Sequence, residues 1–122
     1  MQQRGSLLKS FACAATGIVH ALRAERNVKI HTAATIMVFG AAFGFHITPG
    51  EWCMILLAIG LVWTAELLNT SIEAVVDLVS PDEDELARIA KDTSSGGVLI
   101  AAIASVAVGV IVFGPRLWAM IS

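Results

Sequence analysis

Three long stretches without a charged residue constrain the fold of this chain more than any other feature. Residues 32–48 and 93–113 contain no Asp, Glu, Lys or Arg, and neither does Trp52–Ala65, the first half of the apolar segment 52–79. A helix needs roughly 17–25 mainly apolar residues to cross a bilayer. The sequence therefore predicts three transmembrane helices, at 32–48, 52–79 and 93–113.

The composition also favours lipid over water as the surroundings of this chain. Hydrophobic residues make up 57% of its 122 residues, and charged residues make up 15%. A soluble domain carries about 25% charged residues. The net charge of -2 offers no basic face to a nucleic acid. We therefore expect an all-α integral membrane protein with a single domain, 1–122, and no nucleic-acid partner.

Residues 6–24 have the periodicity of an amphipathic helix. One face of that helix is apolar (Leu7, Leu8, Phe11, Ala15, Ile18, Val19 and Leu22), and the other is polar (Lys9, Ser10, Thr16, His20 and Arg23). Such a helix suits the membrane interface, although the same pattern also fits a helix packed on other protein. We expect a surface helix at 6–24.

The distribution of basic residues orients the three spans. Five of the eight Lys and Arg residues precede the first span: Arg4, Lys9, Arg23, Arg26 and Lys29. Under the positive-inside rule, the N-terminus and the charged connection 82–92 face the cytoplasm. A tight turn at Thr48-Pro49-Gly50 and the C-terminus then face outside. We expect Ser80-Pro81 to end the second span, and a helix to begin after Pro81.

A polar stripe on the second span is the most informative feature for function. Glu66, Asn69, Glu73 and Asp77 follow the spacing i, i+3, i+7 and i+11, which places them on one face of a helix. A charge in the bilayer costs at least ~2.5–3.5 kcal/mol on insertion scales, so such residues usually face protein and have a function. Asn69 also suits an interhelical hydrogen bond, and Asp77 a structural ion pair.

Depth separates the acidic residues of this stripe. Glu66 lies roughly 21 Å from Trp52 along the helix, below the cytoplasmic surface, where a lipid hydroxyl would lie. Glu73 lies two turns further on, at the surface, and we expect Glu25 and Lys91 to converge there. Together they supply carboxylates for Mg²⁺, a lysine for phosphate oxygens and a buried carboxylate for a base. These groups favour phosphoryl transfer from ATP to a lipid hydroxyl.

A second class of function also uses carboxylates in the membrane. A non-enzymatic oligomer could conduct ions or protons past Glu66 and Glu73. Such a path needs polar residues through the whole span, and 36–45 and 52–65 offer almost none. The polar groups lie on one side of the membrane, which favours an enzyme. We interpret His20 and His31 as structural.

Two motifs resemble the prokaryotic diacylglycerol kinase family. They are Glu66-Leu-Leu-Asn-Thr-Ser-Ile-Glu-Ala-Val-Val-Asp77 and, further along the chain, Ala90-Lys91-Asp92. The resemblance implies a homotrimer whose subunits share active sites. It also implies roles for seven residues: a base at Glu66 supported by Asn69, magnesium ligands at Glu25 and Glu73, nucleotide contacts at Lys91 and Asp92, and a lipid contact at Ser95. Asp84 departs from the pattern, because many members have His there.

The segment Glu25-Arg26-Asn27-Val28-Lys29-Ile30-His31 bears on the lipid. It is similar to the E-R-N-x-[KR]-I-H form of family members that phosphorylate undecaprenol. Diacylglycerol is the other candidate. The resemblance implies a place in the bacterial inner membrane, and a reaction that feeds either undecaprenyl phosphate or phospholipid metabolism.

Overall fold

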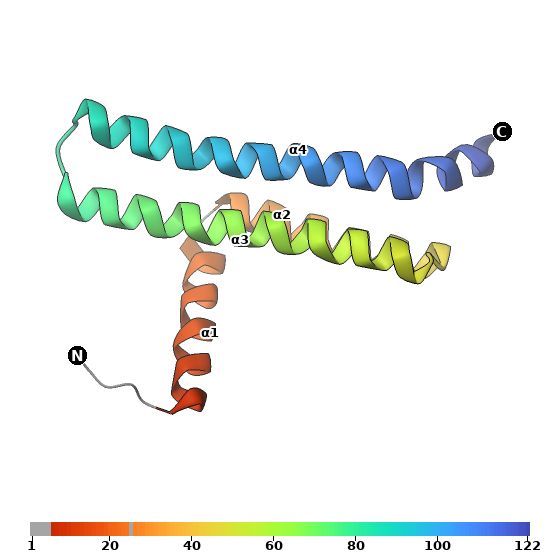
Figure 1. Ribbon diagram of the computed structural model, residues 1–122, viewed down its shortest axis with the longest axis horizontal. Coiled ribbons are helices and arrows are strands. Elements are labelled where there is room, and N and C mark those ends of the chain that lie inside the picture. Colours follow the sequence, from red (N-terminus) through yellow and green to blue (C-terminus); the bar gives the residue numbers. More distant parts are fainter. Residues whose placement is uncertain (1–5, 25) are drawn as a thin grey trace.

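A computed structural model describes residues 6–24 and 26–122 of the chain. This part of the chain folds into four helices with no strand (Figure 1). They are α1 (Leu7–Ala24), α2 (Arg26–Phe45), α3 (Pro49–Val79) and α4 (Glu85–Ile121). Three of them are long and apolar enough to cross a membrane, at Asn27–Phe45, Pro49–Val79 and Glu85–Ile121. The prediction of an all-α membrane protein with three spans is therefore confirmed.

The helices α3 and α4 form the centre of the molecule. They run antiparallel and pack along their length, while α2 lies beside α3 and α1 points across the direction of the other three (Figure 1). We call the end where residues 80–84 join α3 to α4 the loop end. Large side chains such as Leu57, Leu61, Ile100 and Ile103 remain exposed along the spans. Contact between these apolar side chains and water is unfavourable, so lipid or further protein must cover them.

The turn between α2 and α3 lies earlier than the sequence predicted. The expected turn at Thr48-Pro49-Gly50 is wrong, because Pro49 and Gly50 already belong to α3 and the chain reverses at residues 46–48. Thr48 Oγ1 accepts a hydrogen bond from the Glu51 amide at 3.2 Å, and Glu51 Oε1 accepts one from the Thr48 amide at 2.9 Å. This capping box starts the helix, and Pro49 tolerates its first turn because that position needs no N–H donor.

Helix α4 is longer than the predicted third span. The chain leaves α3 at Val79, as Ser80-Pro81 predicted, and α4 begins at Glu85. Asp84 caps it by accepting hydrogen bonds from the Leu86 and Ala87 amides at 3.0 and 3.3 Å. The helix that was expected to begin after Pro81 therefore begins at Glu85 and is continuous with the third span, and the connection is 80–84. With 37 residues, α4 is about 55 Å long and exceeds a membrane core of about 30 Å.

The end of the bundle opposite the loop end is closed by an ion pair and a small core. Arg116 Nη2 and Nη1 lie 2.7 Å from Oε1 and Oε2 of Glu51, which joins α4 to α3 by two hydrogen bonds. Next to this pair, Ala42, Ile47, Ile55 and Val112 form the buried cluster of the described chain. The helix pair is thus fixed at the end far from the acidic stripe, and the stripe lies near the loop end.

Candidate active site

The polar stripe on α3 runs from a buried end to an exposed one. Glu66 is 0% exposed and Asn69 is 6% exposed, whereas Glu73 is half-buried and Asp77 is exposed. This gradient follows the direction of α3 towards the loop end. The side chains that the sequence placed on one face therefore share one face in the fold, with the carboxylate of Glu66 enclosed by protein.

Glu66 meets a histidine that the sequence analysis had interpreted as structural. His31 Nε2 on α2 lies 3.2 Å from Glu66 Oε1, and the His31 side chain is 18% exposed. Within the described residues, neither carboxylate oxygen of Glu66 has an aligned hydrogen bond. The two side chains are therefore in contact without an aligned hydrogen bond. One feature of the sequence could have indicated this contact. His31 is the last titratable residue before the uncharged run 32–45, and that run belongs to a helix that packs against α3.

Asn69 is held by a serine of α4. Ser94 Oγ donates a hydrogen bond to Asn69 Oδ1 at 2.5 Å, which joins the stripe to the opposite helix. The family resemblance implied a lipid contact at Ser95 and gave no role to Ser94. In the fold, Ser94 faces α3, whereas Ser95 is exposed. Consecutive helical residues point about 100° apart, so only one of the two can face Asn69.

The exposed end of the acidic stripe pairs with a lysine of α4. Near the loop end, Lys91 Nζ lies 2.5 Å from Asp77 Oδ1, and the negative charge of Glu73 also acts on Lys91. Asp77 thus makes the structural ion pair that its position allowed. Asp92, the other predicted nucleotide contact, is exposed and lies 3.5 Å from Arg88 Nη1 on the same helix.

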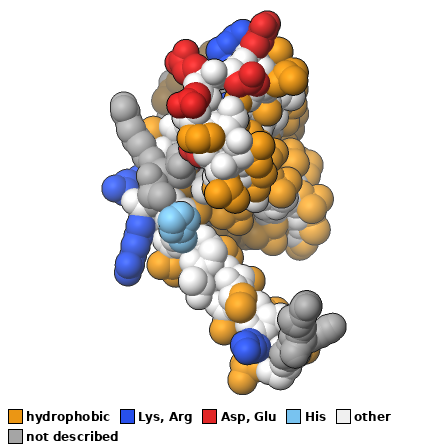
Figure 2. Space-filling view, turned by 90° about the vertical axis from the view of Figure 1, so that its left-hand side faces the viewer, with side chains coloured by type: hydrophobic (Ala, Val, Ile, Leu, Met, Phe, Trp, Pro, Cys, Tyr) orange, Lys and Arg blue, Asp and Glu red, His pale blue; other side chains and the backbone are white. Residues whose placement is uncertain are grey.

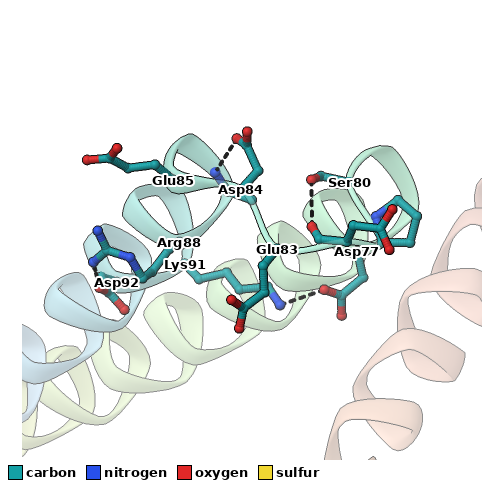
Figure 3. A pocket seen from close by; sticks show the side chains of 11 residues that line it. Asp77, Ser80, Glu83, Asp84, Glu85, Arg88, Lys91 and Asp92 are labelled. Carbon is teal, nitrogen blue, oxygen red and sulfur yellow. Dashed lines mark hydrogen bonds and ion pairs between the residues drawn. The ribbon is translucent and has the colours of Figure 1, made fainter.

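A polar hollow opens at the loop end between the ends of α3 and α4 (Figure 3). It has a volume of about 430 Å³, and its lining is Asp77, Ser80, Pro81, Asp82, Glu83, Asp84, Glu85, Ala87, Arg88, Lys91 and Asp92. Acidic side chains gather on this end of the molecule, while the flanks of the helices are apolar (Figure 2). Because acids outnumber bases around the hollow, a polyphosphate would enter it more readily with its charge neutralised by a metal.

A second hollow is apolar and is lined in part by His31, the neighbour of the buried carboxylate. This groove between α2, α3 and α4 has a volume of about 160 Å³, and its lining is His31, Ala34, Thr35, Val38, Ile59, Val62, Trp63, Ala102, Ser105 and Val106. Trp63 Nε1 donates a hydrogen bond to Thr35 Oγ1 at 3.0 Å, which fixes the indole against α2. His31 therefore borders the groove on one side and touches Glu66 on the other.

The predicted magnesium ligands are only partly visible in the fold. Glu25 lies outside the described residues, and Glu73 lies on α3 about one turn before Asp77. Among the described residues, no three His, Cys, Asp or Glu side chains come close enough together to form a metal centre. A carboxylate such as Glu73 still suits Mg²⁺, which commonly takes one or two protein carboxylates and completes its shell with phosphate oxygens and water.

Comparison with known proteins agrees with this geometry. The sequence model of the family "Prokaryotic diacylglycerol kinase" matches residues 12–113. The chain belongs to the prokaryotic diacylglycerol kinase family. It is 40% identical to the undecaprenol kinase of Bacillus subtilis (strain 168) over 109 residues, which are 89% of each chain.

Two further relatives carry the name diacylglycerol kinase. The protein of Synechocystis sp. is 45% identical over 105 residues, which cover 85% of this chain and 60% of that relative. The protein of Pseudomonas aeruginosa is 28% identical over 95 residues, which cover 78% and 77% of the two chains. Family membership makes the chain a lipid kinase of a bacterial membrane type, which confirms the enzyme class and removes the ion pathway as an alternative.

Proposed function

We propose that this lipid kinase transfers the γ-phosphoryl group of Mg-ATP to the hydroxyl of undecaprenol or diacylglycerol. The observation that carries the proposal is the position of Glu66. Its carboxylate is fully buried, and its neighbour His31 borders an apolar groove on one side, while the charged groups of the polar hollow lie at the loop end. A lipid whose tail follows that groove would bring its hydroxyl to the carboxylate.

Glu66 would act as the general base of this reaction. Its carboxylate accepts the proton of the lipid hydroxyl while the hydroxyl oxygen attacks the γ-phosphorus, and the bond to the bridging oxygen of ADP breaks. Asn69, whose Oδ1 accepts a hydrogen bond from Ser94 at 2.5 Å, would support the carboxylate from the next position along the stripe. Burial helps this step, because water that could compete with the lipid hydroxyl is excluded from a side chain that is 0% exposed.

A metal ion and a lysine would neutralise the negative charge of the nucleotide phosphates. Glu73 and Glu25 would hold Mg²⁺, which when bound offsets the charge of the β- and γ-phosphates. The ammonium of Lys91 would exchange its partner Asp77 for a phosphate oxygen, and Asp92 would contact the nucleotide beside it. The polar hollow lies beside Lys91, which supports nucleotide entry from that side.

Assembly and orientation complete the proposal. The described helices leave Leu57, Leu61 and other large side chains exposed, so neighbouring copies could cover part of these faces. We propose a homotrimer in the bacterial inner membrane, with the N-terminus and the active site at the cytoplasmic face and the C-terminus outside. The five basic residues before residue 32 support this orientation.

The lipid is tested by direct competition. The purified protein in mixed micelles is given Mg-ATP labelled at the γ-phosphate, with undecaprenol and diacylglycerol offered separately and then together. The form of the segment 25–31 favours undecaprenol as the better substrate. Labelled phosphate on either alcohol supports a lipid kinase of this mechanism. Folded protein that labels neither lipid, with and without added Mg²⁺, would overturn it.

A further inference from the structure

The carboxylate of Glu66 has one titratable neighbour at ion-pair distance among the described side chains. His31 Nε2 lies 3.2 Å from Glu66 Oε1, while the ion pairs of Lys91, Arg88 and Arg116 are made with other acids. A glutamate side chain has several rotatable bonds, and no aligned hydrogen bond within the described residues fixes this carboxylate. Its orientation therefore depends on the imidazole of His31.

His31 is itself well placed to fix an orientation. It lies on α2, which packs beside α3, and it also lines the apolar groove. Its backbone carbonyl accepts a hydrogen bond from Thr35 Oγ1 at 2.7 Å, and the same hydroxyl accepts one from Trp63 Nε1 at 3.0 Å. The turn of α2 that carries His31 is thus tied to α3, so the imidazole approaches Glu66 from a fixed backbone.

We propose that His31 is a positioning residue for Glu66. A small rotation of the imidazole aligns its Nε2–H with Oε1. That hydrogen bond holds the carboxylate towards the end of the apolar groove that His31 lines, where the lipid hydroxyl must arrive. The inference rests on the proposed function, because it gives His31 a role only through the base. Misplacement of a reacting group by about 1 Å can lower a rate about 100-fold, so a side chain of this kind affects kcat strongly.

Two substitutions of similar polarity test the proposal. His31→Gln places an amide N–H near the position of Nε2, whereas the side chain of His31→Asn is one methylene too short to reach it. We expect His31→Gln to keep kcat within about threefold of the wild type and His31→Asn to lose it by about 10- to 100-fold, with the KM for Mg-ATP unchanged in both. His46→Asn is the control, because it removes an imidazole at the far end, where φ is 54° and Asn is tolerated.

A double substitution separates positioning from a general effect on folding. In a Glu66→Gln background, His31→Asn should change the residual rate by less than about threefold, because the group it positions is already gone. An equal loss of rate in both backgrounds would show that His31 acts independently of Glu66 and would overturn the proposal. So would equal activity of His31→Asn and His31→Gln per folded protein.

The same measurements keep this inference distinct from the proposed function. A wild-type protein that phosphorylates neither lipid contradicts the function itself. A wild-type protein that is active and loses kcat on Glu66→Gln, but keeps it on His31→Asn, supports the function and refutes only the role of His31. Folding of each variant is monitored by circular dichroism and by its elution in mild detergent.

Discussion

Replacing Glu66 by methionine should stabilise the protein while abolishing its activity. Stability and activity should change in opposite directions, because the reaction needs the Glu66 carboxylate whereas burying that carboxylate destabilises the fold. Glu66 is 0% exposed, and neither oxygen has an aligned hydrogen bond within the described residues. Methionine has a similar length, has no charge and adapts to an irregular space.

The magnitude follows from the surroundings of Glu66. A charge at the centre of a spanning helix costs ~2.5–3.5 kcal/mol on insertion scales, and Glu66 lies off centre, so the penalty is somewhat smaller. The substitution leaves His31 without its carboxylate neighbour, but the His31 side chain is 18% exposed and so is not fully enclosed by protein. We expect the free energy of unfolding to rise by about 1–3 kcal/mol, within the range for apolar replacement of buried ion pairs.

Activity should change far more than stability. Loss of a general base lowers kcat by about 100- to 10,000-fold. Unfolding is followed by near-ultraviolet circular dichroism during titration of mixed micelles with sodium dodecyl sulfate, and the initial rate of lipid phosphorylation is measured on the same samples. Leu68→Met is the matched control, because Leu68 is 58% exposed on the same helix and should shift neither quantity.

Two results would refute this reasoning. A fall in the free energy of unfolding by more than about 1 kcal/mol would mean that the carboxylate stabilises the bundle, so that its burial is not a cost accepted for function. A rate close to that of the wild type would mean that Glu66 is not the base. The second result would also remove the argument that carries the proposed function.

Three further substitutions examine the rest of the site. Ser94→Ala removes the donor to Asn69 and should lower the free energy of unfolding by about 0.6–1.7 kcal/mol, the range for hydrogen bonds between membrane helices; an unchanged unfolding midpoint would contradict it. Glu73→Gln should raise the Mg²⁺ concentration for half-maximal rate, since an amide is a poorer magnesium ligand, and an unaltered Mg²⁺ dependence would argue against this role. Asp77→Asn should release Lys91 and lower the KM for Mg-ATP, whereas a higher KM would show that Asp77 itself contacts the nucleotide.

Some features of this protein follow from single segments of its sequence. Helix formation and membrane insertion depend on the residues within one span, so the uncharged runs indicated three helices before any packing was known. The stripe of Glu66, Asn69, Glu73 and Asp77 was also visible, because the helical period alone places these residues on one face. The family's motifs lie on that same stripe and on Ala90-Lys91-Asp92, which explains why resemblance and periodicity led to the same site.

Helix ends were predicted less well than helix centres. A helix was expected to begin after Pro81, and α4 begins at Glu85, where Asp84 caps it. What the sequence did not indicate is that this helix continues without a break into the third span. The turn before α3 was placed on Pro49 and Gly50 because these residues commonly form turns. Proline also suits the first position of a helix, and a capping box between Thr48 and Glu51 decided the matter.

Contacts between helices were decided only by the tertiary structure. The rotation of each helix about its own axis determines that His31 meets Glu66, that Ser94 rather than Ser95 meets Asn69, and that Lys91 pairs with Asp77. A helical period fixes which residues share a face but not which neighbouring helix that face meets. That choice depends on how the side chains of α2, α3 and α4 pack together, over separations of 25 residues for Asn69 and Ser94.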